Sequence, residues 1–286
     1  MPGNKRHLAH SKKHLNRIKE MIRAVDVVLE LVDARAPQSS QNEELYRSVK
    51  PGGRIIVLHK SDLANPDVTR CWVEHFQKQG LKVFSFSAKL SRKKLLSHLN
   101  DYWSSGKFAR FNRPLRLMVA GMPNVGKSTL VNLLLQKKVT HTGDRPGITR
   151  GSQWIRIHPR LELLDTPGVL QPAAGDEWTY QCLAALGILP PNKYDSEETA
   201  LWLINLLKSS NRLSLLSERF GVEPEEEFLP EEYLKKIGKA RGCLIGGGEV
   251  NFQEASQVLL KDLREGLLGA ISLEAPPEEE EEKGEN

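Results

Sequence analysis

Short, nearly continuous apolar runs recur in the first 165 residues and predict buried strands. The clearest examples are residues 55–58 and 117–120, and further strands are predicted at residues 82–86 and 161–165. Runs of this length, bounded by turn residues, are typical of strands that are covered on both faces. Segments with helical composition separate them. The pattern therefore predicts an α/β fold with a predominantly parallel sheet and helices on both faces.

The hydrophobic pattern changes after a break at residues 187–192, which contains Pro190 and Pro191. Beyond this break the spacing becomes helical. Helices are predicted at residues 197–210, 212–220, 230–240 and 252–268. Trp202, Leu203 and their neighbours Leu206 and Leu207 are expected to pack in a core rather than bind a ligand. A small all-α domain should therefore follow the α/β domain.

The breaks divide the chain into four segments. Residues 1–22 form a basic N-terminal arm, expected to be helical from about Ser11, with apolar residues on one face (Leu15, Ile18 and Ile22). Residues 23–178 form the α/β domain and residues 179–273 the helical domain. Residues 274–286 form an acidic tail that self-repulsion should keep disordered.

Residues 121–128 read GMPNVGKS and form a complete phosphate-binding loop between a predicted strand and a predicted helix. Its glycines let successive backbone N–H groups point at a triphosphate on the helix N-terminus. Lys127 should reach the β- and γ-phosphates, and the Ser128 hydroxyl should bind Mg²⁺. The predicted nucleotide contacts in this segment are Asn124, Val125, Gly126, Lys127, Ser128 and Thr129.

Two downstream segments complete a phosphate and Mg²⁺ site. Asp165 ends a strand and is placed to hold Mg²⁺ through water, and the Gly168 N–H can meet a γ-phosphate. Thr149, in the glycine- and proline-rich stretch 143–149, is the predicted switch hydroxyl on Mg²⁺, with Thr142 as a weaker alternative. An ordinary turn is the other interpretation of that stretch.

The residues predicted to read a guanine base lie upstream of the phosphate loop. Asp62 can accept hydrogen bonds from guanine N1 and N2, Lys60 can lay its stem along the base, and the Ala88 N–H can meet guanine O6. His59 stands where the usual pattern has Asn, and an imidazole can replace only part of that amide's contacts with the phosphate loop. The predicted contacts of these two segments are His59, Lys60, Asp62, Ser87, Ala88 and Lys89.

The motifs run base-reading, phosphate, switch, which is a rotation of the Ras-like order. This rotation, the sequence DARAP at residues 33–37 and the sequence KARGCLIGGG at residues 239–248 resemble the YlqF/RbgA family of circularly permuted GTPases. The resemblance implies a circularly permuted Ras-like P-loop GTPase domain with GTP or GDP as ligand. It also implies action in late assembly of the large (50S) ribosomal subunit, with binding to rRNA in the GTP state and release on hydrolysis.

Charge is unevenly distributed. The chain carries a net charge of +5, yet the tail from Glu274 carries seven Glu and one Lys, so residues 1–273 carry +11. Basic residues gather in the first 23 residues and again before the phosphate-loop strand (Lys107, Arg110, Arg113 and Arg116). Such clusters suit an RNA backbone. A solvated helix face and a basic linker are the alternative interpretation.

The remaining composition narrows the setting. No apolar run is long enough to cross a membrane, and three widely spaced cysteines favour a reducing cytosol. We therefore expect a cytoplasmic protein without a membrane partner, acting as a monomer on the large ribosomal subunit or its precursor.

The sequence does not by itself identify the residue that positions the attacking water. Val169 stands where Ras-like enzymes carry the Gln that positions water. The resemblance offers His10 of the basic arm as the catalytic residue, with a surface histidine without such a role as the alternative. It also offers Asn124 as a ligand for K⁺. Rival functions are a GTP-sensing module that recruits a protein, a GTPase acting on another RNA and, least favoured, an ATPase.

Overall fold

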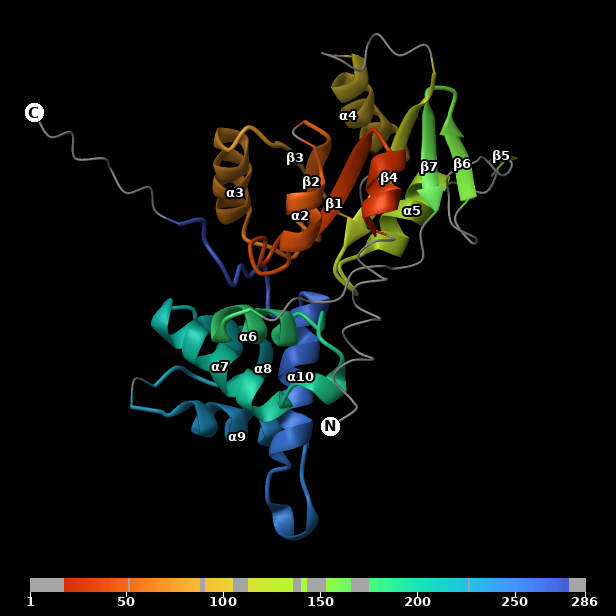
Figure 1. Ribbon diagram of the computed structural model, residues 1–286. Coiled ribbons are helices and arrows are strands. Elements are labelled where there is room, and N and C mark those ends of the chain that lie inside the picture. The colour runs from red at the N-terminus through yellow and green to blue at the C-terminus, as the bar shows by residue number, and fades with distance from the viewer. Residues whose placement is uncertain are drawn as a thin grey trace, which may run out of the picture.

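The computed structural model describes residues 18–50, 52–87, 91–104, 113–135, 140–142, 153–165, 175–225 and 227–277. A sheet covered by helices forms one part of the molecule, and a group of helices lies against one end of it (Figure 1).

The described residues form a sheet of seven strands in the order β3-β2-β1-β4-β7-β6-β5. Five of them run parallel, whereas β6 pairs antiparallel with β7 and β5 pairs antiparallel with β6. Their bounds are β1 Val27–Asp33, β2 Arg54–His59, β3 Lys82–Phe86, β4 Leu115–Gly121, β5 Thr140–Thr142, β6 Gln153–His158 and β7 Leu161–Asp165. The predicted, mostly parallel sheet is confirmed.

Alternate residues of the central strands face opposite helix layers. On one face, Ile56 and Leu58 of β2 contact Trp72 and Phe76 of α3 (Pro66–Lys78). Farther along that face, α2 (Glu43–Ser48) and a helix at residues 18–24 pack on β1 and β4, and this helix buries Ile18 and Ile22. The opposite face is covered by α4 (Arg92–Ser104) and α5 (Lys127–Leu135).

The helical part follows the sheet in sequence. Its members are α6 Glu177–Ala185, α7 Ser196–Ser209, α8 Ser214–Phe220, α9 Pro230–Arg241 and α10 Phe252–Glu265. Leu203 and Leu207 are buried, and Trp202 and Leu206 pack against the same core. The predicted α/β fold with a following all-α region is confirmed. Helix α6 was not among the predicted helices.

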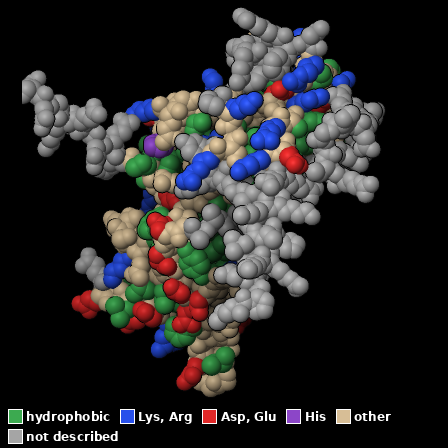
Figure 2. Space-filling view, viewed as in Figure 1, with side chains coloured by type: hydrophobic (Ala, Val, Ile, Leu, Met, Phe, Trp, Pro, Cys, Tyr) green, Lys and Arg blue, Asp and Glu red, His purple; other side chains and the backbone are tan. Residues whose placement is uncertain are grey.

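The surface reflects the uneven charge of the chain. Lys and Arg side chains gather over the sheet-bearing part, and Asp and Glu side chains lie mainly over the helices below it (Figure 2). Among the described residues, no helix is both long and apolar enough to cross a membrane.

Candidate guanine-nucleotide site

The candidate site lies where four parallel strands end at the same edge of the sheet. Register pairs Asp33 of β1 with His59 of β2, and His59 with Phe86 of β3, while Leu31 of β1 pairs with Gly121 of β4. Ligands of open α/β sheets bind outside the carboxyl ends of the strands. The fold therefore brings the base-reading segment after β2 next to the phosphate loop after β4.

The phosphate loop has the backbone that its glycines permit. Gly121 and Gly126 have φ angles of 150° and 104°, and Asn124 has a φ of 57°. A Cβ on Gly121 would lie 2.5 Å from the Leu31 carbonyl oxygen, so only glycine fits against β1. The buried Val125 anchors the loop from inside. The loop thus forms a tight turn that ends at the N-terminus of α5, a position where backbone N–H groups can bind an anion.

Lys127 begins α5 and is half-buried beneath the loop. Its Nζ donates to the Met122 carbonyl oxygen at 2.6 Å. Burial lowers the pKa of this ammonium, because charge is costly away from water. A phosphate would offer this cation a stronger acceptor than a neutral carbonyl. The predicted contacts Ser128 and Thr129 are exposed in the first turn of the same helix.

The His59 ring joins the two halves of the site by packing. It stacks on Phe86 with ring centroids 5.1 Å apart, and its other neighbour is Gly126, where an added Cβ would lie 2.2 Å from His59 Cε1. The ring is buried, and the Val125 backbone lies close enough to favour its protonated form. Its contact with Gly126 of the phosphate loop is a van der Waals contact, which takes the place of a contact expected from an Asn amide.

The predicted base-reading side chains surround this ring. Lys60 extends its Nζ to within 3.4 Å of the Asn124 carbonyl oxygen, which is in the phosphate loop. Asp62 is exposed, and Ser87 is half-buried after β3. The Ser61 N–H donates to the Phe86 carbonyl oxygen at 3.3 Å and joins the two base-reading segments. These contacts leave the ends of β2 and β3 facing the space beside the phosphate loop.

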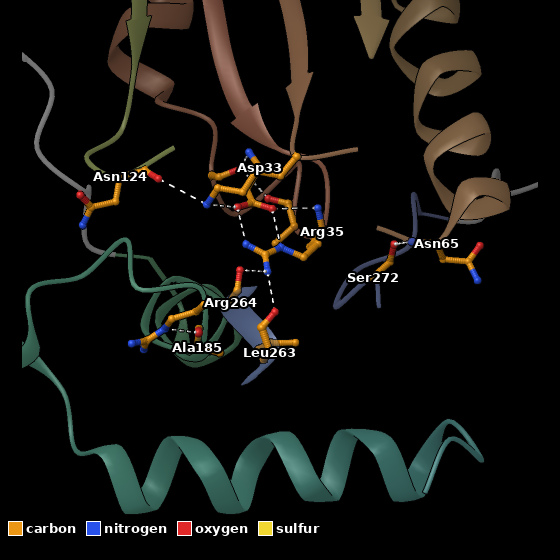
Figure 3. A network of polar contacts seen from close by, with 11 residues as sticks. Asp33, Arg35, Asn65, Asn124, Ala185, Leu263, Arg264 and Ser272 are labelled. Atoms are coloured by element: carbon orange, nitrogen blue, oxygen red, sulfur yellow. Dashed lines mark hydrogen bonds and ion pairs between the residues drawn. The ribbon is translucent and has the colours of Figure 1, made fainter. Parts of the chain in front are cut away.

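Two residues matter more than their role in the sequence pattern suggested. In the sequence, Asp33 and Arg35 stand out only as part of the family signature DARAP. In the structure the Asp33 carboxylate accepts a hydrogen bond from Lys60 Nζ at 3.0 Å, and Arg35 lies fully buried beside it (Figure 3). The sequence signal that could have pointed to this ion pair is an acidic residue at the end of a strand, two positions before an arginine.

Several predicted site residues lie outside the described part of the chain. They are His10, Ala88, Lys89, Thr149 and Gly168. Asp165 ends β7, the neighbour of β4, but the structure does not describe its side chain. The residues that are described fit a nucleotide and Mg²⁺, because the loop backbone, the half-buried ammonium and an exposed hydroxyl converge on one helix N-terminus.

We expect the stability of the protein to depend on the protonation of His59. Burial, followed by the charge of Lys60, lowers the pKa of this ring, although Asp33 opposes the shift. The unfolded chain binds this proton near pH 6.5, whereas the folded chain binds it only at a lower pH. The free energy of unfolding should therefore be highest above pH 6.5 and decrease as the pH falls below that value, by at most about 1.4 kcal/mol per pH unit.

Urea titrations of the wild type and of His59→Asn between pH 5 and pH 8 measure this contribution. The variant keeps His158, whose pKa is also lowered, so the difference between the two profiles isolates His59. The variant should lose less stability on acidification. Parallel profiles would show that folding does not shift the pKa of His59.

Together the sheet order, the phosphate loop and the base-reading segments before it define a circularly permuted P-loop GTPase. The profile of the 50S ribosome-binding GTPase family matches residues 116–217. Ribosome biogenesis GTPase A from Priestia megaterium is 35% identical in an alignment of 281 residues that covers 95% of this chain and 96% of the relative. The Thermotoga maritima protein is 30% identical over 267 residues, which are 93% and 92% of the two chains. The chain belongs to the ribosome biogenesis GTPase A family.

Solved structures agree with this assignment. A GDP-bound YlqF superimposes with a TM-score of 0.69 at 28% identity, covering 91% of this chain and 98% of the other. The GNP-bound YlqF from T. maritima superimposes with a TM-score of 0.68 at 27% identity, covering 92% and 98%. The resemblance inferred from the motifs is confirmed.

Proposed function

We propose that this protein is a GTP-hydrolysing switch in late assembly of the large ribosomal subunit. It binds the pre-ribosomal particle in the GTP state and leaves after hydrolysis. The convergence of the base-reading segment and the phosphate loop on one sheet edge is the observation that carries the nucleotide part. The ribosomal part follows from the relatives, which are named for ribosome biogenesis.

The site residues divide into base-reading and phosphate-binding groups. Asp62, Lys60 and the Ala88 N–H select guanine, with Ser87 and Lys89 completing the loop after β3. Lys127 binds the β- and γ-phosphates, while the backbone from Asn124 to Thr129 surrounds them. The packing of His59 supports this division, because its ring contacts Phe86 at the end of β3 and Gly126 in the phosphate loop.

Mg²⁺ is held in this proposal by Ser128, Thr149 and, through water, Asp165. When bound, the ion neutralises charge that develops on the phosphates. Gly168 senses the γ-phosphate through its N–H. Two observations support this donor set: Ser128 is exposed in the first turn of α5, and β7, which Asp165 ends, pairs with β4, the strand that leads into the phosphate loop.

A K⁺ ion near Asn124 would supply positive charge where other GTPases use an arginine. Asn124 Nδ2 donates to the Gly187 carbonyl oxygen at 2.8 Å. That bond orients the amide and leaves Oδ1 as the side-chain oxygen available to a cation. The chemistry of this residue therefore suits the role.

His10 is our candidate for positioning the attacking water, because Val169 cannot do so. It lies in the basic arm, which we propose contacts rRNA. Lys19 near the end of the arm and Arg23 just after it are exposed and suit phosphate contacts. In the second basic group, Arg113 pairs with Asp26 at 2.7 Å, which favours a structural role there.

Cosedimentation tests the proposed partner directly. The protein should pellet with large ribosomal subunits in the presence of a non-hydrolysable GTP analogue and remain in the supernatant with GDP. Binding should weaken steeply as salt is raised, because phosphate contacts release counterions. Small subunits serve as the matched control. We expect the protein to act in the cytoplasm.

Two results would contradict this proposal. Equal binding to both subunits would favour a GTPase that acts on another RNA. Binding that resists salt and ribonuclease would favour a module that recruits a protein partner, with hydrolysis as a timer. We expect a monomer in the unbound state, which analytical ultracentrifugation of the free protein measures.

A further inference from the structure

The Asp33 carboxylate is shared by two cations that serve different parts of the molecule. Asp33 Oδ1 accepts from Arg35 Nε at 2.9 Å, and Oδ2 accepts from Arg35 Nη2 at 2.9 Å and from Lys60 Nζ at 3.0 Å. Burial alone would raise the pKa of this carboxyl, but the two cations hold it well below its usual range. Asp33 is thus a fixed negative charge in the interior.

One of these cations belongs to the proposed guanine site. Lys60 has a φ of 57°, a left-handed conformation that is uncommon for residues other than glycine. Its ammonium lies between Asp33 Oδ2 and the Asn124 carbonyl oxygen, 3.0 Å and 3.4 Å away. Asp33 therefore fixes where this lysine, and the aliphatic stem that would lie along the base, can point.

The other cation holds the helical domain. Arg35 Nη1 donates to the Leu263 carbonyl oxygen at 2.9 Å, 228 residues away in sequence, and reaches the Arg264 carbonyl oxygen at 3.5 Å. These carbonyls belong to the last turn of α10, where helix ends leave acceptors unsatisfied. The Arg35 carbonyl oxygen in turn accepts from the Leu273 N–H at 2.7 Å. Arg35 therefore contacts α10 and the segment after it.

A second route connects the same helix to the phosphate loop. Arg264 donates from Nε to the Ala185 carbonyl oxygen at 2.9 Å and from Nη2 to the Ala184 carbonyl oxygen at 2.8 Å, at the end of α6. Two residues on, the Gly187 carbonyl oxygen accepts from Asn124. The contacts run from β1 through α10 and α6 back to the phosphate loop, and Figure 3 shows them around Arg35.

We propose that Asp33 is a positioning residue that couples guanine-nucleotide binding to docking of the helical domain, through Lys60 on one side and Arg35 on the other. This inference rests on the proposed guanine site. If the domain withdraws, Arg35 loses its carbonyl partners and Asp33 must rearrange with it, which moves Lys60. Coupling between two sites is reciprocal, so a nucleotide that engages Lys60 also favours the docked domain.

A double-mutant cycle separates this coupling from a purely structural ion pair. Arg35→Lys keeps the positive charge, but a single ammonium cannot donate to both Asp33 oxygens and also to the carbonyl oxygens of α10. It should weaken binding of a fluorescent GDP analogue about 10-fold when Lys60 is present. In the Lys60→Ala background the same substitution should change the affinity less than about 2-fold, because the link to the base is gone.

Arg54→Lys is the matched control. Arg54, the first residue of β2, forms a comparably buried pair with Glu30 of β1 at 2.5 Å, and it lies at the end of β2 away from the proposed site. Its substitution should disturb packing to a similar degree and leave the affinity for the GDP analogue unchanged. Equal losses for Arg35→Lys and Arg54→Lys, or additive losses for Arg35→Lys and Lys60→Ala, would overturn the coupling.

Hydrogen exchange tests the reciprocal effect without depending on a buried substitution. In the full-length wild type, GDP should slow exchange of the Leu273 amide, which donates to Arg35, and of the Ile271 amide, which donates to Leu63. Lys60→Ala should remove this protection. Exchange that is the same with and without bound GDP would overturn the inference alone, whereas failure of the wild type to bind GDP would overturn the guanine site as well.

Discussion

Lys127→Ala is expected to lower kcat/KM for GTP hydrolysis by a factor on the order of 100 or more, which is the usual loss when one preorganised donor to a reacting phosphate is removed. The structure holds this ammonium under the phosphate loop, with the Met122 carbonyl oxygen as its acceptor. Steady-state phosphate release at several GTP concentrations measures the effect.

Folding is the necessary control for Lys127→Ala. Burial lowers the pKa of Lys127, so the charged form is not stabilised by its surroundings, and the substitution removes a single hydrogen bond to a carbonyl. The free energy of unfolding should change by no more than about 1 kcal/mol. A stably folded variant that hydrolyses GTP at the wild-type rate would show that Lys127 does not contact the phosphates.

Gly126→Ala should have the second largest effect and should act through shape. Gly126 has a φ of 104°, and a Cβ there would lie 2.2 Å from His59 Cε1. The backbone strain alone costs about 1–3 kcal/mol, and the collision displaces either the phosphate loop or the His59 ring. We expect affinity for the GDP analogue to fall on the order of 100-fold, together with a lower free energy of unfolding.

Gly80→Ala is the matched control for this substitution. Gly80 also has a positive φ, 77°, but a Cβ there would meet nothing within 4 Å. It should lose stability from strain and keep full affinity for the nucleotide. His59→Ala combined with Gly126→Ala should recover part of the lost affinity. Equal loss of affinity for the two glycine variants would exclude the collision as the cause.

The parts of the fold that the sequence predicts are those with strong local signals. The apolar runs that became β2, β4 and β7 are buried strands with few competing interpretations. The strand predicted at residues 82–86 is also present, but β3 lies at the edge of the sheet and buries only Phe86. The phosphate loop is recognisable because its chemistry restricts the residue types, as the φ angles of Gly121 and Gly126 show. Leu203 and Leu207 were predicted as core from helical spacing, and both are buried.

Helix α6 shows why other parts were missed. Five consecutive residues, from Gln181 to Ala185, are buried, so the second half of the helix shows no alternation of buried and exposed positions from which a helical period could be read. The signals that could have found it are at its ends. Asp176 caps its N-terminus by accepting from the Thr179 N–H, and Gly187, with a φ of 68°, follows its end.

The contacts between distant segments could not be predicted from local pattern. Nothing in the sequence around Arg35 indicates that its guanidinium meets the Leu263 carbonyl oxygen. The pattern likewise gives His59 as a departure from Asn but not the ring packed against Gly126. Both contacts depend on how whole elements pack, which no short window of sequence contains.

The most direct test of the central claim is GTP hydrolysis in K⁺ buffer, measured with and without purified large ribosomal subunits. Small subunits and ATP serve as controls, and His10→Ala is included alongside the wild type. We expect a slow basal rate and a large rise that is specific to the large subunit and to GTP, and that His10→Ala greatly reduces. A wild-type rate that neither subunit changes would contradict a switch that acts on the large ribosomal subunit.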